Sequence, residues 1–440
     1  MRLQRTPPGF VARSDRRARW GAVRPGAGLA FVLVLLGARA VGAFPPTLNS
    51  SGQADFTYGT QVESGGGPAT GYKPESKLFY TADNRWWAVL GTSGGGSTAP
   101  GVHLYGLDTK HAWQPTLQLP GADPWEKADT LLDGDTLYVA LRDNRSLSGN
   151  PRQSRLYELR YTGSGAWTVL SGPTVMTTAN PETLTLARDS RGRLWTTYES
   201  SQAIRVGYTA PGGTAFTFTS LPTTAVDADD ISTVIAFGSA ARGYKIGVLW
   251  SDQVARRDWF AWRFDADPIR SDTWHIETAY GAGVGACPTV ASSACADDHL
   301  NVKTSGDEVY AAVKTSLDGG TPDPHDPLIV LLRRDAIGTW AAYPVSPVSQ
   351  GATRPIVLLA PALDRIWVFA ARSGGVSVWE SPFSAASFDS SASILWTKAS
   401  SGTINNPTST KQLVTGATGA VVETSKSSAH QYWHNEFLAR

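Results

Sequence analysis

Three adjacent residues, Asp297-Asp298-His299, form the densest group of acid–base side chains in the sequence. A histidine beside carboxylates is favoured in its protonated form, which suits a general acid or base near neutral pH. Lys303 follows on the same predicted strand and offers a cation for a substrate carboxylate. We therefore predict that His299, Asp297, Asp298 and Lys303 are catalytic residues.

The same residues also fit a structural role. Short polar side chains at the start of a β-strand commonly satisfy nearby backbone N–H groups. A structural His299 would affect stability when substituted, whereas a functional one would affect turnover or binding. Both interpretations stay open from the sequence.

Other acidic residues do not form a recognisable metal motif. Asp227, Asp229 and Asp230 lack the fixed ligand positions and the terminal glutamate of an EF-hand loop. Capping of loop N–H groups is the alternative use of these aspartates. We predict no cofactor and no metal site; a structural calcium ion stays open, although no motif supports it.

The only two cysteines, Cys287 and Cys295, lie close together in the sequence. An exported protein enters an oxidising compartment, so we predict a disulfide that cross-links the two ends of this loop. Two unpaired thiols are the alternative. Neither CxxC nor a zinc-type histidine spacing accompanies the pair.

Residues 1–43 have the pattern of a secretory signal peptide. An arginine-rich leader precedes an apolar stretch from Gly26 to Gly37, and small residues follow up to Ala43. A membrane anchor is the alternative, but a span needs about 20 apolar residues and Arg39 interrupts this one too early. We predict that the mature chain, 44–440, is secreted or held at the cell surface, in the periplasm or outside the cell, without membrane insertion.

Removal of the leader changes the charge of the protein. The precursor has a formal charge of +1, whereas the mature chain carries about 31 basic and 37 acidic groups and is therefore mildly acidic. A chain without basic runs is a poor partner for nucleic acid or for an anionic membrane surface. We predict no nucleic-acid partner.

A strand pattern recurs along the whole mature chain. Each copy has a turn rich in Asp, Asn, Gly or Arg followed by an apolar-aromatic strand, as in 133–140. The strand centres are Trp87, Tyr138, Trp195, Val248, Tyr310, Trp367 and Val421. Their spacings of 51, 57, 53, 62, 57 and 54 residues indicate one unit repeated seven times.

Each repeat predicts four antiparallel strands. One strand precedes the aligned strand, a third follows it, and a fourth carries an aromatic residue such as Trp113 or Trp167. Four strands in about 40–60 residues is the size of a propeller blade, and radial closure protects sheet edges. We predict an all-β, seven-bladed β-propeller of four-stranded antiparallel blades spanning 44–440 as one domain. A pair of β-sandwiches is the alternative, but it does not predict a single period.

The last repeat lacks a fourth strand, because the chain ends soon after the segment 430–437. A β-rich segment near 56–60 precedes the first repeat and has no other partner. We predict that this segment completes blade seven at its outer edge.

The repeat also predicts where charged residues meet. In an antiparallel blade, the segment that leads into strand one and the segment that leaves strand two lie on the same face. Polar side chains in these segments therefore gather around one mouth of the central channel. Those that we predict to bind substrate are Glu75, Glu126, Lys127, Glu182, Asp229, Asp230 and Arg354.

The Asp/Gly-x-x-aromatic strand openings resemble propellers with sialidase-type (BNR) repeats, over the mature chain. The chain departs from that pattern: Ser-x-Asp-x-Gly-x-x-Trp boxes are missing, and Arg354-Pro355 lacks the middle residue of the sialidase Arg-Ile-Pro motif. Asp297-Asp298-His299 is similar to an Asp-Asp-His opening in propellers that act on acidic polysaccharides. The resemblance implies a sialidase-like fold but not sialidase activity.

Three functions follow from these observations. The first is a propeller that binds carbohydrate at the polar mouth of its channel. The second is a polysaccharide lyase or glycoside hydrolase with His299 as general acid or base. The third is a cell-surface scaffold for protein interactions, in which the mouth is only solvated. We predict the first function and keep the other two as alternatives, because fold alone assigns no function.

Overall fold

The computed structural model describes residues 47–437 except 65–66, 72, 144–152, 180, 224–225, 282–286 and 288–294. The chain divides into two units, Met1–Phe44 and Pro45–Arg440. The first unit, with the predicted signal peptide 1–43, lies outside the described residues. In the part of the chain that is described, no helix is long and apolar enough to cross a membrane.

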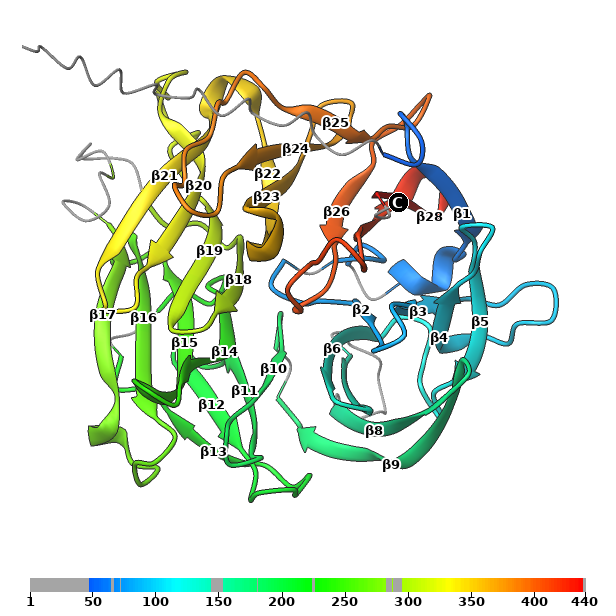
Figure 1. Cartoon of the computed structure of the whole chain (residues 1–440), viewed down its shortest axis with the longest axis horizontal. Helices are drawn as coiled ribbons and strands as arrows, with labels where there is room; N and C mark the ends of the chain where they lie inside the picture. The colour runs from blue at the N-terminus through cyan, green and yellow to red at the C-terminus, as the bar shows by residue number, and fades with distance from the viewer. Residues whose placement is uncertain are drawn as a thin grey trace, which may run out of the picture. The chain divides into compact units, whose positions relative to one another are not determined.

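Within the described residues, the second unit contains 28 strands in seven antiparallel sheets of four strands each, and the sheets surround a central axis (Figure 1). Blade one is β2(Leu78–Tyr80)-β3(Trp86–Thr92)-β4(Gly101–Leu107)-β5(Trp113–Gln118), and blade two is β6(Lys127–Asp133)-β7(Thr136–Arg142)-β8(Ser154–Gly163)-β9(Ala166–Thr177). Blade three is β10(Thr185–Arg188)-β11(Leu194–Glu199)-β12(Ile204–Tyr208)-β13(Thr217–Ser220), and blade four is β14(Ser232–Ser239)-β15(Gly243–Asp252)-β16(Arg257–Phe264)-β17(His275–Tyr280).

Blades five and six are β18(Leu300–Ser305)-β19(Glu308–Lys314)-β20(Pro327–Arg334)-β21(Trp340–Pro347) and β22(Thr353–Ala360)-β23(Arg365–Arg372)-β24(Gly375–Ser381)-β25(Ile394–Thr397). Blade seven is β26(Asn405–Thr408)-β27(Ala420–Lys426)-β28(Gln431–Phe437)-β1(Gln53–Thr57). Short 3-10 turns are η1(Thr60–Glu63), η2(Ser271–Thr273), η3(Val348–Gln350), η4(Pro361–Leu363) and η5(Ser427–Ala429). The predicted seven-bladed β-propeller is confirmed.

The strands aligned in the sequence are the second strands of the seven blades. Trp87, Tyr138, Trp195, Val248, Tyr310, Trp367 and Val421 lie in β3, β7, β11, β15, β19, β23 and β27. These strands are flanked on both sides within a sheet and are also covered by neighbouring blades, so residues of β3 are buried along its whole length. The outer strand β5 is mostly exposed, which explains its polar sequence.

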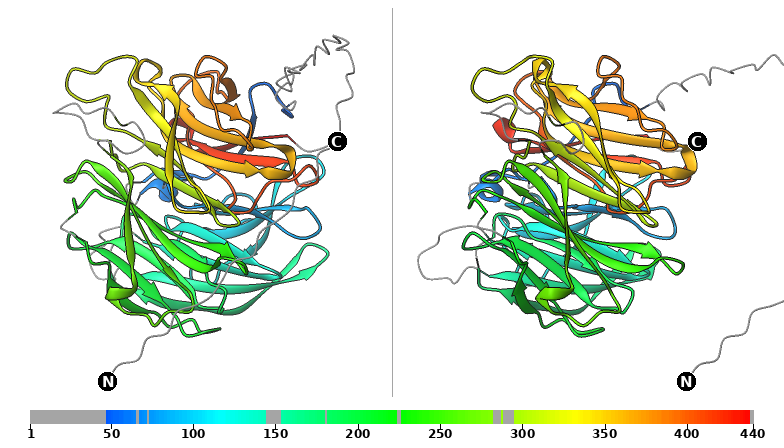
Figure 2. Two further views of the ribbon diagram at one scale, coloured as in Figure 1. Left: turned by 60° about the vertical axis from the view of Figure 1, so that its left-hand side comes forward. Right: turned by 90° about the vertical axis from the view of Figure 1, so that its left-hand side faces the viewer.

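Aromatic side chains fill the spaces between adjacent blades. The Trp87 ring of blade one meets Tyr161 and Trp167 of blade two edge-on, with centroids 5.8 and 5.5 Å apart. Trp195 of blade three meets Trp274 of blade four in the same way, at 6.2 Å. Each large ring buries about 150–250 Å². The twisted sheets that these rings join are seen from two sides in Figure 2.

Blade seven is built from both ends of the propeller unit. Strand β1 pairs antiparallel with β28, with Gln53 opposite His434, and the two strands lie side by side in Figure 1. The predicted closure is therefore confirmed, although the strand begins three residues earlier than the predicted segment. A bulge between Ala54 and Thr57 interrupts the pairing.

The closure yields a first prediction. Deletion of residues 44–57 should remove the partner of β28 and leave unpaired N–H and C=O groups along an exposed edge. We expect a lower melting temperature and aggregation, measured by calorimetry and light scattering. Deletion of 44–47 alone is the control, because it leaves β1 intact. Equal melting temperatures for the two deletions would rule out this role of β1.

Candidate functional site

The candidate site lies where segments leading into the first strands of blades one, three, four and five converge. Lys73 precedes β2, Glu182 precedes β10, Asp229 precedes β14 and Asp298 precedes β18. The Lys73 ammonium lies 3.3 Å from Glu182 Oε1 and also pairs with Asp298. We call these four residues the mouth cluster. Since blade one is not adjacent to blade three or five, Lys73 reaches across the mouth of the channel.

Carboxylates in the mouth cluster lie close enough to influence one another. One oxygen from each of Glu182, Asp229 and Asp298 lies within 4.8 Å of the others. Asp229 is exposed and Glu182 is 30 % exposed in its side chain, so a ligand can reach them. Lys73 itself is only 8 % exposed. The cluster therefore presents carboxyl groups to solvent, and the mostly buried ammonium of Lys73 pairs with Glu182 and Asp298.

His299 lies beside the mouth cluster and is held by its two neighbours. Its Nδ1 lies 2.5 Å from Asp298 Oδ1 and also contacts Asp297. Asp297 in turn accepts a hydrogen bond from Lys314 Nζ at 2.7 Å. The imidazole is thus oriented through Nδ1, whereas Nε2 is buried and has no hydrogen-bond partner among the described residues.

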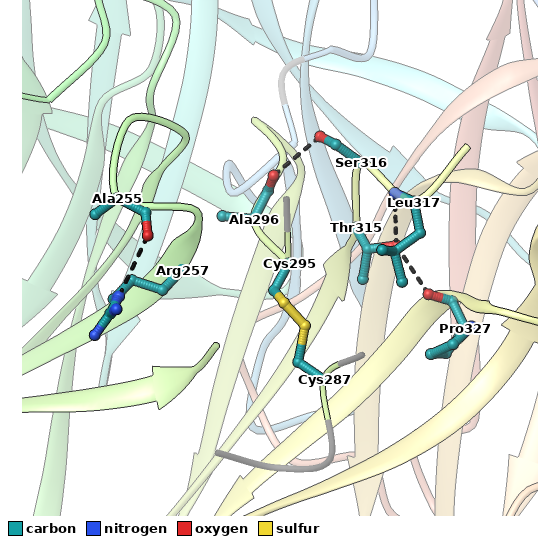
Figure 3. The surroundings of a disulfide bond; sticks show 9 residues. All are labelled: Ala255, Arg257, Cys287, Cys295, Ala296, Thr315, Ser316, Leu317 and Pro327. Carbon is teal, nitrogen blue, oxygen red and sulfur yellow. Dashed lines mark hydrogen bonds between the residues drawn. A yellow bond between two sulfur atoms is a disulfide. The ribbon is translucent and has the colours of Figure 1, made fainter. Parts of the chain in front are cut away.

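The disulfide Cys287–Cys295 stands immediately before this segment (Figure 3). Its Cα atoms are 6.2 Å apart, within the usual range for a disulfide. The next residue, Ala296, accepts a hydrogen bond from Ser316 Oγ at 3.0 Å, which ties the segment to the loop after β19. The predicted disulfide is confirmed, and it anchors the approach to Asp297, Asp298 and His299.

The environment separates the pKa values of the carboxyl groups. Burial raises the pKa of Glu182, and the negative charges of Asp298 and Asp229 raise it further against the opposing effect of Lys73. Burial and Asp298 likewise raise the pKa of Asp229. Burial also opposes ionisation of Asp298, but hydrogen bonds and charge from His299, with the charge of Lys73, hold its pKa well below the ordinary range. The environment thus shifts Glu182 and Asp229 toward their protonated forms and Asp298 toward its ionised form.

Lys303 lies deeper, inside the channel, and not at the mouth with His299. Its ammonium donates to Ser76 Oγ at 3.3 Å, and burial lowers the pKa of Lys303 to about 7. A cavity of about 150 Å³ lies next to it, lined by inner-strand residues such as Leu186 and Val234 and by Pro74 and Lys411. Lys303 therefore belongs to the packing of the channel.

Two further predicted residues, Glu75 and Lys127, are also buried near the channel. Glu75 accepts from Arg142 Nε at 2.7 Å and from Lys77 Nζ at 3.0 Å. Lys127 donates to the carbonyl of Val62 at 2.7 Å, and burial lowers its pKa to about 7. These ion pairs and hydrogen bonds explain the presence of charged residues in inner strands.

Glu126, Asp230 and Arg354 complete the predicted set. Glu126 is buried in an ion pair with Arg155. Asp230 accepts from the backbone N–H of Asp227 at 2.7 Å, and burial raises its pKa to about 6. Arg354 is half-buried at a bulge at the start of β22, with a φ of 55°. Of the seven residues predicted to bind substrate, the mouth cluster brings together only Glu182 and Asp229.

Two cations of the site were not among the predicted site residues. Lys73 and Lys314 both lie on the face predicted for the mouth, Lys73 before β2 and Lys314 at the end of β19. Their position in the repeat, on the face predicted for the mouth, was the sequence feature that could have indicated them as site residues. The choice among all lysines on that face needed the ion pairs of the folded protein.

Two groups of ligand atoms at the mouth have metal-like spacing: Glu182 with Asp229 and Asp298, and Asp297 with Asp298 and His299. Lys73 already pairs with two of the first group, and Lys314 with Asp297. These ammonium groups supply the positive charge that a cation would bring.

No protein-family model matches the chain, and no curated protein matches it. Among solved structures, an α-L-arabinanase from Penicillium chrysogenum is 11 % identical, covers 76 % of this chain and 99 % of its own, and has a TM-score of 0.44. An α-L-arabinofuranosidase from Fusarium graminearum is 12 % identical over 77 % of this chain and 99 % of its own, with a TM-score of 0.43. Prolyl oligopeptidase B from Galerina marginata is 13 % identical over 81 % of this chain and 48 % of its own, with a TM-score of 0.42.

At these identities and TM-scores, the similar structures carry no argument about function. They also do not single out sialidase-type repeats, so the predicted resemblance stands only at the level of the seven-bladed propeller. The function must be argued from the side chains.

The disulfide gives a second prediction. The bond closes a short loop of the chain, so its loss should destabilise the protein by roughly 2–3 kcal/mol. Intact mass under denaturing conditions should show no alkylatable thiol until a reductant is added, and chemical unfolding should then shift to lower denaturant. Full alkylation without reductant would contradict the bond, and Cys287→Ser with Cys295→Ser should reproduce the shift.

Proposed function

We propose that this protein is a secreted carbohydrate-active propeller that binds a glycan at the mouth cluster and hydrolyses a glycosidic bond there. One observation carries the proposal: the cluster holds an accessible carboxyl group with a raised pKa beside a carboxylate with a lowered pKa. Pairs of carboxyl groups whose environments separate their pKa values are the machinery of glycoside hydrolysis.

Glu182 is the proposed general acid. Its raised pKa keeps the proton available for the leaving oxygen. Asp298 is the proposed carboxylate that faces the sugar carbon, and His299 and Lys73 stabilise its ionised form. One oxygen of Glu182 and one of Asp298 lie within 4.8 Å of each other, which is a closer pair than the roughly 6.5–9.5 Å of inverting enzymes. Asp229 adds negative charge that favours the protonated form of Glu182.

Asp297 and Lys314 have a positioning role in this proposal. Lys314 is fixed between Asp297 and Asp318, at 2.7 and 3.2 Å, and so holds Asp297 against the imidazole of His299. His299 in turn orients Asp298. Lys303, Glu75, Glu126, Lys127, Asp230 and Arg354 are not assigned contacts with the glycan.

Carbohydrate binding without cleavage is the second candidate function. The observation that favours it is the pairing of Lys73 with both Glu182 and Asp298, which satisfies the two carboxylates without a substrate. Carboxylates fixed in this way are good acceptors for sugar hydroxyl groups. A lyase reaction with His299 as base is a variant of the enzymatic function, supported by the unpartnered Nε2. Export is part of each version, since the disulfide indicates an oxidising compartment.

The third prediction tests the catalytic carboxyl groups. Glu182→Gln and Asp298→Asn should each lower turnover of a neutral or acidic polysaccharide by about 10²–10⁴-fold, because each removes one proton-transfer or charge-stabilising group. Reducing-end release across a glycan panel is the assay, and glycan affinity is measured in parallel. Glu158→Gln on β8 is the matched control and should keep full activity.

The outcomes separate the candidate functions. Glycan binding without release by the unaltered protein would assign it as a binder. Ultraviolet absorbance on incubation with polyuronates, lost in His299→Ala but kept in Glu182→Gln, would assign the lyase reaction. No binding and no release by any glycan would reject carbohydrate as the ligand.

The fourth prediction concerns pH. Activity needs protonated Glu182 and ionised Asp298, so kcat/KM should fall as pH rises through the raised pKa of Glu182. Lys73→Met should move this alkaline limb to higher pH, because the ammonium lowers the pKa of Glu182 in the folded protein. A kcat/KM that rises with pH on the alkaline side, where Glu182 loses its proton, would contradict the assignment, because it would report a base in place of an acid.

A further inference from the structure

A second cluster of ionisable groups lies far from the mouth, in the outer part of blade seven. Asp55 comes from β1, Glu423 from β27, and His434 and Glu436 from β28. Glu423 lies directly opposite His434 in the strand pairing, and Asp55 lies in the bulge of β1 beside β28. A bulge re-aims the side chain that it carries. Three adjacent strands thus direct four ionisable side chains to one place.

These side chains are withdrawn from solvent. Glu423, His434 and Glu436 are fully buried, and the side chain of Asp55 is 2 % exposed. Among the residues that the structure describes, the only ion-pair partners of the three carboxyl groups are imidazoles. His434 pairs with Asp55 and Glu436, and His111 pairs with Glu436. Buried charge is costly unless it is paired. The cluster therefore gathers three carboxyl groups without a lysine or arginine beside them in the described part of the chain, and burial raises the pKa of Asp55 and of Glu423.

Several polar atoms in the cluster have no partner. Within the described chain, no hydrogen bond reaches Glu423 Oε1, His434 Nε2 or Glu436 Oε2, although all three residues are fully buried. Buried polar atoms are nearly always satisfied, so unsatisfied ones call for an unseen ligand. Glu423 Oε2, in contrast, accepts from the indole N–H of Trp113 at 2.8 Å. One oxygen of this carboxyl group is thus held by an indole, and the group also lies against Asp55, whose charge adds to the effect of burial in raising the pKa of Glu423.

We propose that Asp55, Glu423 and His434 bind a divalent cation that joins the N-terminal strand β1 to the C-terminal strands β27 and β28. One ligand atom from each of the three residues lies within 4.8 Å of the others. His434 Nδ1 lies 2.8 Å from both oxygens of Asp55, so an ion bound by both side chains would replace this contact and move the ligand atoms to the roughly 3.4 Å of a tetrahedral site with bonds of about 2.1 Å.

The surrounding residues fit the requirements of the ligands. A metal-bound histidine usually donates its other N–H to a carboxylate, and His434 Nε2 lies 3.8 Å from Glu436 Oε1. His111 Nδ1, at 2.5 Å, holds that same Glu436 oxygen, and Trp113 holds Glu423. One imidazole with two carboxylates suits a zinc-like ion, whereas calcium prefers six to eight oxygens. The site is thus assigned to Zn²⁺ or a chemically similar first-row cation.

The first experiment needs no substitution. The full exported chain is purified, treated with a chelator and dialysed, and then titrated with Zn²⁺, Mn²⁺ and Ca²⁺ by calorimetry. We expect one Zn²⁺ per chain, weaker binding of Ca²⁺, and a melting temperature that rises with free Zn²⁺, because the ion binds only the folded closure. No binding of any of these ions, with the same melting temperature in chelator and in Zn²⁺, would overturn the site and leave a proton-bridged cluster.

Substitutions then locate the ion. Glu423→Gln should weaken Zn²⁺ affinity more than about 100-fold, and Trp113→Phe, which keeps the ring but loses its N–H, about 10–100-fold. Glu126→Gln is the matched control: it also breaks a buried glutamate contact, with Arg155, but should keep the affinity for Zn²⁺. Unchanged Zn²⁺ affinity in Glu423→Gln would place the ion elsewhere and reject the proposal. The glycan assays at the mouth do not report on this site, so the two proposals fail independently.

Discussion

The pairing of β1 with β28 is the contact on which the rest of the structure depends. Seven sheets around an axis form a stable ring only when the last sheet meets the first, and blade seven takes its fourth strand from the beginning of the propeller unit. Residues at positions 53–57 thereby become neighbours of residues at 431–434. The central channel, its mouth and the convergence of segments from distant blades all follow from this closure.

Burial decides which charged residues remain available for chemistry. Near the channel, Glu75, Arg142 and Lys77 are buried and bonded to one another, so their charges support the packing of inner strands. At the mouth, Glu182 and Asp229 keep exposed surface while they feel the charges of Asp298 and Lys73. The two environments contain the same residue types. They differ in solvent access, and solvent access is what a substrate requires.

The two ionisable clusters differ in the cations that pair with their carboxyl groups and in their access to solvent. The mouth cluster balances its carboxylates with lysines that come from other segments, and it is open to solvent on one side. The blade-seven cluster is closed and has imidazoles as its only cationic partners among the described residues. For this reason we propose a glycan as the ligand of the open mouth cluster and a metal ion as the ligand of the closed blade-seven cluster.

The sequence by itself determined the repeat and therefore the number of blades, because each blade needs one buried apolar-aromatic strand and the period of Trp87, Tyr138 and Trp195 records it. It also predicted the closure, since a repeat without a fourth strand needs one from elsewhere in the chain, and it predicted the disulfide from two nearby cysteines, with two unpaired thiols as the alternative. These features depend on local pattern and on counting.

Only the tertiary structure decided which charged residues meet. Lys73 and Asp298 are 225 positions apart in sequence, and nothing in either segment indicates that one reaches the other across the mouth. Glu75 precedes the first strand of its blade as Glu182 does, yet its side chain is buried, and so are those of Lys127 and Lys303 within first strands. Asp55 and His434 became neighbours through the ring closure and a bulge. Side-chain direction and burial depend on the packing of whole blades, and that packing is set by contacts between residues far apart in the chain.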